Sequence, residues 1–322
     1  MDFQPTEEQR DLRAGVRGLL AGRYGREALR ASVDTGVAVD RGLWRELGEA
    51  GFFALRLPEA AGGVGLGLPE AVLLFEEAGR ALLPGPLVAT HLAAGVVPGA
   101  ADGTAVVTAF DLAGGLVAHL AEADAVLGAA ELPAGEPVRS ADPLTPLHRV
   151  ASVGDVSPYV SVGALLTAAL QVGSALRTVE LAVRYAGERE QFGQPIGAFQ
   201  AVKHLCARML VRAEVARTAV YAAAVTAEGA VTGGGAEGAV TGEGTEGVEG
   251  AEAGEIAAAK LLADEAAVLG ARDCLQVHGG MGFTWEADVH LHLKRAWVRA
   301  EQWRTAAEAE ELLAAELLGS LS

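Results

Sequence analysis

The stretch RYAGEREQFGQPIGAFQAVKHLCARM, from Arg184 to Met209, is a polar turn between two helical runs. Its glycines and its proline, in the segment GEREQFGQPIG, mark a tight turn. Around Phe192 the turn gathers charged and amide side chains: Glu188, Arg189, Glu190, Gln191 and Gln194. Only 21% of the chain is charged, so this concentration predicts that something large and polar meets the turn.

Apolar residues recur at helical spacing on both sides of the turn, from Pro158 onward and from Val202 to Val220. A third long helix, from Ile256 to Val277, has a face of small side chains, and a last helix covers Ala306 to Leu318. These stripes are typical of an ordinary helical core. The first two faces are Leu166, Leu170, Gly173, Leu176, Val179 and Val183, then Val202, Leu205, Met209, Ala213, Ala216 and Val220.

The segment 227–255 interrupts the helical pattern. It repeats AEGAVTG at 227 and 236 and holds seven Glu but no Lys or Arg. Such a segment buries too little apolar surface to order itself, so we expect a flexible loop between two helices.

The first hundred residues are predicted to be helical throughout. Thr6 is a suitable N-cap for a helix over 6–22, a second helix lies around Trp44–Ala50, and a third begins at Pro69 and ends near Leu83. We therefore expect an N-terminal helical domain over 1–101.

Between 102 and 155 the apolar period changes to that of short strands. So few strands form a small sheet that needs covering helices, and we expect a β-domain over 102–155 followed by a helical bundle over 156–322. The predicted strands are Thr104–Phe110, Ala125–Leu127, Pro137–Arg139 and Arg149–Val153.

Composition limits the class of protein. A net charge of −17 argues against nucleic-acid binding, which needs clustered Lys and Arg. Cys206 and Cys274 lack the spacing of a disulfide framework or a zinc site and are interpreted as core residues in a reducing compartment. Two uncharged runs, Ala81–Ala101 and Val156–Leu176, are long enough to span a membrane but are better interpreted as buried bundle helices.

The N-terminus MDFQPTEEQRD lacks the basic and then apolar order of a signal peptide, so we expect a cytoplasmic protein with no membrane span. No GxSxG, P-loop or HExxH motif is present. His290 and His292, two apart in a predicted helix, point to nearly opposite faces, and we expect no metal site.

A second polar, glycine-rich segment ends the third long helix and contains Gln276, His278, Gly279, Gly280 and Gly282. Glycines here allow positive φ and the close approach of a ligand such as a pyrophosphate. The alternative is a simple glycine C-cap. From this segment alone the cap is the favoured interpretation.

Together these segments resemble the acyl-CoA dehydrogenase family over most of the chain. The last two motifs are highly specific in combination. In family order the matching motifs are TEEQRDLR at 6–13, LWRELGEAGFFALRLPEAAGGVGL at 43–66, LFEEAGRAL at 74–82, YAGEREQFGQPIGAFQAVKH at 185–204 and QVHGGMGFTWEADVHL at 276–291.

The resemblance implies a mainly α fold with an N-terminal helical domain, a middle β-domain and a C-terminal four-helix bundle, with FAD lodged between the last two. In this family the RxxFG turn reaches across a subunit interface, so Arg189 is expected to meet the FAD phosphates or adenosine of a neighbour. The other expected cofactor contacts are Gln191, Phe192, Phe199, Gln200, Gln276, Gly279 and Gly280.

The departures from the family concern the catalytic base, a carboxylate that removes the substrate's α-proton. The common position of this base corresponds to Arg304, where the chain has AEQWRT at 300–305 and lacks the family's usual YEGT motif. The alternative position of the base corresponds to about Gly163. The Asp and Arg that usually help to hold the acyl-CoA are replaced by Ser161 and Ala164. Catalytic residues are left unassigned, since the nearest carboxylates, Glu286 and Glu301, are unsupported as a base.

The middle domain is also reduced, because the family's TEPxAGSD loop and GxKxWIT strand are not recognisable between Asp102 and Asp155. The chain thus resembles the partner subunits of heteromeric bacterial acyl-CoA dehydrogenases, which act on CoA esters of bulky acyl groups such as sterol side chains. The expected partners are a second dehydrogenase subunit and an acyl-CoA or acyl-carrier-protein thioester. Two alternatives stay open: a self-sufficient homo-oligomer with a relocated base, and a non-catalytic scaffold on this fold.

Overall fold

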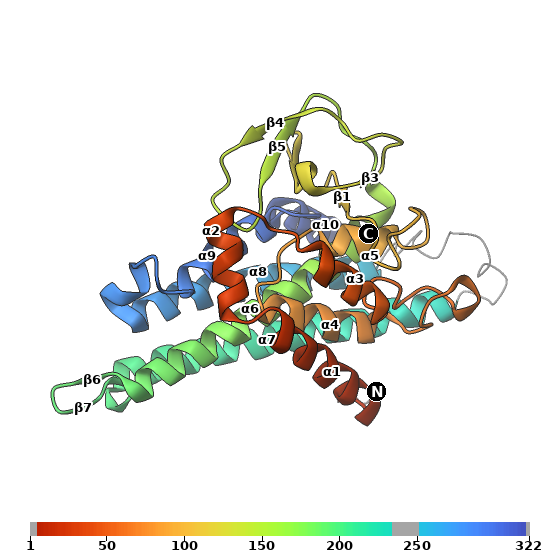
Figure 1. The fold of residues 1–322 in the computed structure, drawn as a ribbon. Helices are drawn as coiled ribbons and strands as arrows, with labels where there is room; N and C mark the ends of the chain where they lie inside the picture. Colours follow the sequence, from red (N-terminus) through yellow and green to blue (C-terminus); the bar gives the residue numbers. More distant parts are fainter. Residues whose placement is uncertain (1–4, 234–250, 320–322) are drawn as a thin grey trace.

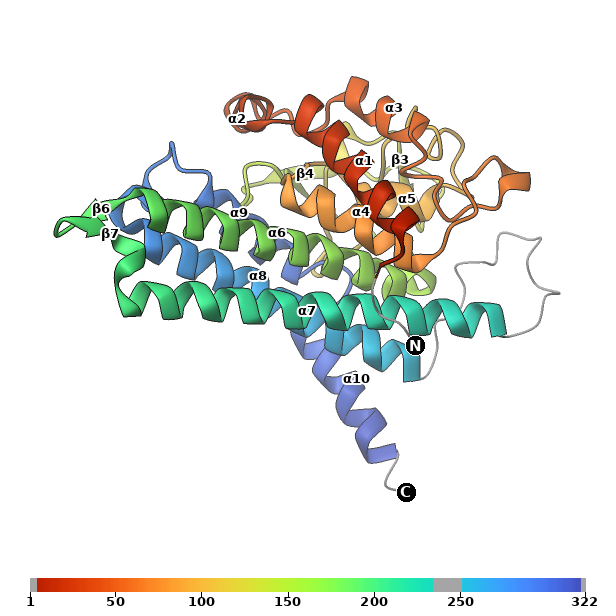
Figure 2. The same ribbon diagram turned by 90° about the horizontal axis from the view of Figure 1, so that it is seen from below.

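The computed structural model describes residues 5–233 and 251–319, and its body is a set of long helices lying side by side (Figures 1 and 2). The hairpin that joins α6 to α7 projects from one end of this set, and a small β-part covers one side. The helices are α1 (Glu7–Arg23), α2 (Arg26–Thr35), α3 (Arg41–Glu49), α4 (Leu68–Arg80), α5 (Leu87–Ala93), α6 (Val160–Glu188), α7 (Gln200–Gly233), α8 (Ala251–His278), α9 (Val289–Ala300) and α10 (Ala306–Gly319).

The predicted apolar faces of the long helices are largely confirmed. Leu166 to Val179 on α6 and Met209 to Val220 on α7 contribute buried residues, and Ala-rich α8 packs against both. Val202 and Leu205 are half-buried. Val183 is exposed, contrary to expectation, because the last turns of α6 extend beyond α4 toward the hairpin (Figure 1).

Helix α4 connects the N-terminal half to the bundle by crossing α6 at very short range. A Cβ atom on Gly173 would lie 1.9 Å from the Glu76 carbonyl oxygen, and one on Gly79 would lie 2.1 Å from that of Leu170. Only glycine at both positions permits this backbone approach. The buried Glu76 and Glu77 then pair with Arg13, Arg17 and Arg217, which ties α1 and α7 to α4.

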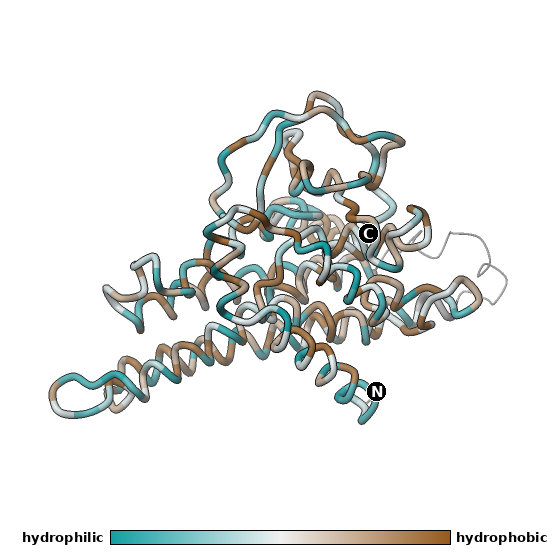
Figure 3. The backbone as a smooth tube through the Cα atoms, viewed as in Figure 1, coloured by the Kyte–Doolittle hydropathy of each residue, from teal (hydrophilic) through white to brown (hydrophobic). Residues whose placement is uncertain are grey.

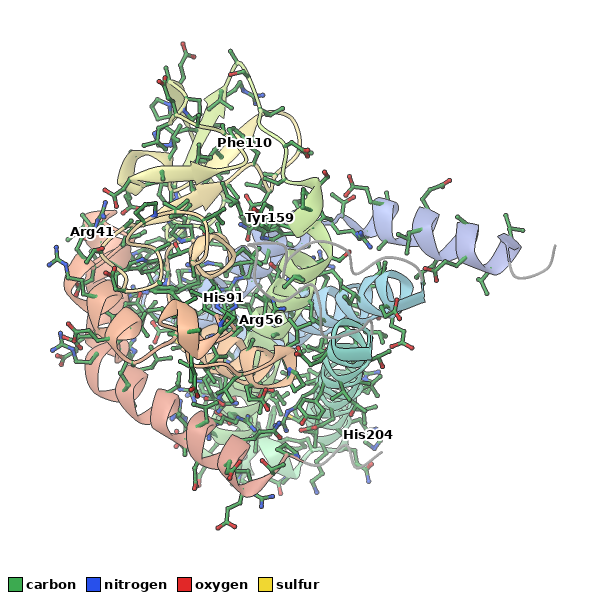
Figure 4. The ribbon with its side chains drawn as sticks, turned by 90° about the vertical axis from the view of Figure 1, so that its right-hand side faces the viewer. Arg41, Arg56, His91, Phe110, Tyr159 and His204 are labelled. Carbon is green, nitrogen blue, oxygen red and sulfur yellow. The ribbon has the colours of Figure 1, made fainter. Side chains whose placement is uncertain are left out.

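The interior of the N-terminal half is aromatic. His91 of α5 contacts Phe75 edge-to-face at 5.4 Å between ring centroids, and its Nδ1 lies 3.2 Å from the Phe52 carbonyl oxygen. Burial and the nearby Arg56 lower the pKa of His91 to about 3, and Figure 4 shows these two residues close together. The aromatic rings that contact one another in pairs are Trp44, Phe52, Phe53 and Phe75.

The β-part contains a parallel pair, β1 with β3, and an antiparallel sheet of order β2-β5-β4. All four predicted strands overlap observed ones, but only 125–127 matches residue for residue, and the strand over 116–118 was missed. Figure 3 shows apolar segments where this part faces the helices. The strands are β1 (Val107–Ala109), β2 (Leu116–Ala118), β3 (Ala125–Leu127), β4 (Gly135–Val138) and β5 (Leu147–Val150).

Three expectations need correction or limits. The run 81–101 forms no bundle helix, because Pro84 and Pro86 delay helix formation and α5 has only seven residues. The expected loop over 227–255 is helical at 227–233 and 251–255, where Ala227 and Ala253 are buried. Residues 234–250 lie outside the described residues.

Among the described residues one helix, Ser157–Glu188, has the length and hydropathy of a membrane span, and 83% of its most apolar window is buried inside the protein.

Candidate functional site

The polar turn that opened the sequence analysis is a β-hairpin of β6 (Glu190–Gln191) and β7 (Gln194–Pro195). Phe192 and Gly193 at its tip have φ of 54° and 76°, which is the left-handed pair of a two-residue type I′ turn. Phe192 is 91% exposed and meets Phe199 edge-to-face at 6.1 Å. The hairpin projects from the end of the bundle (Figure 1), so it presents a large aromatic ring to the outside of the chain.

Arg189 lies at the base of the hairpin, directly after α6. Its backbone is fixed because its carbonyl accepts the Ile196 N–H at 2.7 Å. Its guanidinium is exposed and has no hydrogen-bond or ion-pair partner among the described residues, so the alternative of a surface pair with Glu188 or Glu190 is not observed. A fixed backbone with an unpaired guanidinium suits a ligand that comes from outside.

The second predicted segment lies at the same end of the bundle, at the C-terminus of α8. Tyr185 of α6 stacks on His278 at 4.2 Å between ring centroids, and His278 Nδ1 lies 2.8 Å from the Cys274 carbonyl oxygen. This stack brings the two motifs, far apart in sequence, onto one surface. Cys274 itself is buried, which raises the pKa of its thiol to about 12.

The glycines after α8 have the backbone conformation of a helix cap and also leave open space for a ligand. Gly279 has φ 58°, as a glycine cap does, and a Cβ atom on Gly279 or Gly280 would meet nothing within 4 Å. Gln276 is exposed beside them. The surface is thus open to a ligand, while the cap accounts for the backbone conformation.

Electrostatics at this end suit a pyrophosphate at one place. The C-terminal ends of α6 and α8 carry partial negative charge, which repels phosphate, whereas the N-terminal end of α7, at Gln200, carries partial positive charge. Arg189 supplies a full positive charge close to it in the chain. The residues present therefore fit one side of an FAD site, with the other side open to solvent, and the individual contacts stay predictions.

The two positions that the family resemblance predicts for the base hold Gly163 and Arg304, neither of which is a carboxylate. A Cβ atom on Gly163 would lie 2.3 Å from the Trp303 indole, so Trp303 fills the space that a side chain there would need. Arg304 is half-buried, and its Nη1 lies 3.5 Å from the Ala253 carbonyl oxygen. Glu286 and Glu301 are exposed and point to no cavity.

A small cavity borders Trp303 between α5, β1, α6 and α9. Its volume is about 30 Å³, room for one or two water-sized species. No acyl chain fits into a space of this size. Its polar lining includes Thr167, Asp111, Arg295, Arg299 and Gln302.

Asp111 is the functional candidate that the sequence analysis missed. Its Oδ2 accepts a hydrogen bond from Gln302 Nε2 at 2.8 Å, its Oδ1 is buried without a partner in the described chain, and burial raises its pKa to about 7. A carboxyl group with this pKa is suited to proton transfer near neutral pH. The available signal was an acid ending the apolar run TAVVTAF.

The remaining histidines have structural surroundings. His204 is exposed on α7 (Figure 4), and His290 stacks on Trp285 at 5.1 Å. His292 is buried, with its Nδ1 2.8 Å from Ser174 Oγ, and burial lowers its pKa to about 3. No group of His, Cys, Asp and Glu within 5–233 and 251–319 is arranged to hold a metal ion.

Comparison with known proteins gives matches over nearly the whole chain. Acyl-CoA dehydrogenase IpdE2 of Mycobacterium tuberculosis is 34% identical, with 97% of this chain and 98% of that protein covered. A solved variant of the Tcur3481-Tcur3483 steroid ACAD is 25% identical, with a TM-score of 0.79, 98% of this chain and 99% of that chain. The ChsE4-ChsE5 complex from Mycobacterium tuberculosis has the same fold, with 23% identity, a TM-score of 0.78 and 99% of each chain covered.

Family models support the same assignment from two independent segments. Residues 6–107 match the acyl-CoA dehydrogenase N-terminal domain, and residues 159–305 match the acyl-CoA dehydrogenase C-terminal domain. The second segment contains both the hairpin and the glycine-rich end of α8. The chain belongs to the acyl-CoA dehydrogenase family.

Proposed function

We propose that this chain is one subunit of a hetero-oligomeric, FAD-dependent acyl-CoA dehydrogenase, to which it contributes cofactor contacts and not the catalytic base. One contrast carries the proposal. Arg189, Gly279 and Gly280 are open and unpartnered within the described residues, while Trp303 fills the space beside Gly163 and borders a cavity of only about 30 Å³. The intact side of the site faces outward and the substrate side is closed.

The surface around the cofactor contacts supports a protein partner. Phe192 and Phe283 are 91% and 75% exposed, and Met281 and Trp285 beside Phe283 are exposed as well. Large apolar side chains gathered at an otherwise polar end are typical of an interface. The similarity to the Tcur3481-Tcur3483 steroid ACAD, whose name gives two proteins, agrees with this interpretation.

FAD is the cofactor of this family, and when bound it accepts the hydride from the substrate's β-carbon. In the proposed complex Arg189 binds the FAD phosphates or adenosine, and Gln191, Phe192, Phe199 and Gln200 line the same cleft. Gln276, Gly279 and Gly280 contact the adenine and pyrophosphate end. The carboxylate that removes the α-proton comes from the partner subunit.

The proposed substrate is an acyl thioester, carried by CoA or by an acyl-carrier protein, and the proposed location is the cytoplasm. The cavity beside Trp303 is too small for an acyl chain, which supports a substrate site in the partner. A bulky acyl group of the sterol type is the substrate class we propose, in line with the steroid dehydrogenase to which the chain is similar.

Flavin absorbance tests the proposal directly. The chain is purified alone and again after co-expression with an acyl-CoA dehydrogenase encoded beside it, and both samples are assayed with an artificial electron acceptor. We expect a colourless, inactive chain alone and a yellow, active complex. A yellow, active chain alone contradicts the proposal, and colourless samples in both preparations favour the scaffold alternative.

Asp111 is the observation that favours the second candidate, a self-sufficient enzyme with a relocated base. It is buried next to Trp303, with a pKa raised to about 7. That function requires the cavity to open by several fold when substrate binds. The Asp111→Asn variant decides between the two, because it abolishes activity only if Asp111 is the base.

A further inference from the structure

The cavity beside Trp303 holds more positive charge than its acidic groups neutralise. Arg295 and Arg299, one turn apart on α9, both line it and are both only 3% exposed. Arg295 Nε pairs with the buried carboxylate of Asp142. The Arg299 guanidinium has no ion pair within the described chain, and its one hydrogen bond there runs from Nη1 to the Leu170 carbonyl oxygen at 3.4 Å.

Donor groups around the cavity are also incompletely used. Arg295 donates from Nη1 to the Leu83 carbonyl oxygen, while its Nη2 has no partner among the described residues. Thr167 lines the same cavity, and its hydroxyl makes no hydrogen bond within the described residues. Burial and the nearby Arg295 together hold the pKa of Arg299 well below its usual range. A buried charge in this state is costly unless a counter-ion compensates it.

The other titratable groups near the cavity do not supply that compensation. Asp111 lines it but is hydrogen-bonded to Gln302 and not to either arginine, and its raised pKa leaves it largely uncharged below neutral pH. Burial lowers the pKa of His119, which pairs through Nδ1 with Glu122 at 2.8 Å. Two guanidinium groups therefore share the single carboxylate of Asp142, and one positive charge remains.

We propose that this cavity binds one monatomic anion, a halide such as chloride, between the guanidinium groups of Arg295 and Arg299. The volume of about 30 Å³ admits a species of roughly water size, which excludes phosphate, sulfate and carboxylates. The anion completes the charge balance of the layer between α6, α9 and the β-part. It accounts for two buried arginines where only the carboxylate of Asp142 pairs with an arginine of the cavity.

Thermal unfolding of the full chain near pH 6 tests the site without any flavin or activity. Saturating chloride or bromide should raise Tm by about 2 °C above gluconate at the same ionic strength, because an anion that binds only the folded chain stabilises it. The Arg299→Leu variant should lose this halide dependence. The matched Arg208→Leu variant, which changes an exposed arginine on α7, should keep it.

Crystals soaked in bromide give a second measurement that does not depend on the variant folding. We expect an anomalous peak between Arg295 and Arg299. Equal Tm values in chloride, bromide and gluconate together with no bromide peak in the cavity would overturn the proposal and leave a water molecule there. The result is independent of whether the chain has a partner subunit.

Discussion

The hairpin end of the bundle and the cavity beside Trp303 are opposite in physical character. At the hairpin, Arg189 and Phe192 project into solvent and Gly280 leaves open space for a ligand. At the cavity, Trp303 fills the space next to Gly163 and about 30 Å³ remain. Within one chain, the surface suited to a cofactor is kept open while the interior suited to a substrate is packed shut.

Under the proposed function, this chain separates cofactor contact from substrate turnover. Contacts to FAD need only a rigid surface with a cation and an approachable backbone, which the ends of three helices provide. Turnover needs an acid–base group and a space for the acyl chain inside the bundle. A substitution in one of the two regions should therefore leave the property of the other region unchanged.

The Arg189→Ala variant has the largest expected effect on the open end. A hydrogen bond to a charged group contributes about 1.5–3 kcal/mol, so flavin affinity of the co-expressed complex should fall by roughly 10- to 100-fold. Flavin content after gel filtration and titration with FAD measure the loss. The thermal stability of the isolated chain should stay unchanged, because the side chain is exposed and unpartnered among the described residues.

Arg45→Ala, which removes an exposed arginine on α3, is the matched control. It should leave flavin occupancy at the wild-type level. If Arg189→Ala also keeps full occupancy, the hairpin has no role in cofactor binding and the proposed interface is wrong.

Gly163→Ala tests the closed region. The added methyl group would meet the Trp303 indole at 2.3 Å, and overpacking of this kind costs about 1–3 kcal/mol. Gly187→Ala, in the same helix but with nothing within 4 Å of its Cβ, is the control and should be neutral or slightly stabilising. Urea unfolding of both variants measures the difference. Equal stability would mean that Trp303 moves away easily and that the cavity can open.

The pH dependence of stability tests the buried state of Asp111. Its pKa is about 7 in the folded chain and about 3.9 in the unfolded one. Between these values only the folded chain keeps the proton, so its stability falls as pH rises, by at most about 1.4 kcal/mol per pH unit. Above pH 7 the loss is complete, and Asp111→Asn should remove the slope.

Two histidines give stability the opposite pH dependence to that of Asp111. Wild type and the Asp111→Asn variant are therefore compared at each pH. The pKa values of His91 and His292 are lowered to about 3, so their folded forms stay neutral while the unfolded chain takes up protons below pH 6.5. Their contribution therefore falls as pH falls. The difference between wild type and Asp111→Asn isolates Asp111, and a flat difference between pH 4 and 7 would show that its carboxyl group is hydrated.

Local patterns in the sequence predicted most of the helices and strands, while the cofactor contacts of the open end stay predictions. The strand over 125–127 was predicted to the residue, since an acid and a glycine bound its apolar run. The extension of α7 through 227–233 was not predicted. There Glu228 Oε2 accepts the Leu68 N–H at 2.8 Å and caps α4, a contact across 160 residues that composition cannot reveal.

The packing around Trp303 also depends on contacts between residues far apart in the sequence. Gly163 and Arg304 alone indicated a missing base, but nothing local to Gly163 indicates that Trp303 fills its space. Asp111 was overlooked because its partner Gln302, which follows α9, lies almost two hundred residues away along the chain. The hairpin and the glycine-rich end of α8 were easier to locate from the sequence, because local turn residues define both.

Gly280→Ala has the smallest expected effect and separates the two interpretations of the glycines after α8. Its Cβ would meet nothing in the isolated chain, so folding should be unaffected. If a pyrophosphate approaches this backbone, the methyl group weakens flavin binding in the complex, by about 1 kcal/mol or roughly fivefold. Exposed Gly187→Ala serves again as control. Unaltered flavin affinity in both variants would reduce this segment to a helix cap and leave Arg189 as the main cofactor contact of the open end.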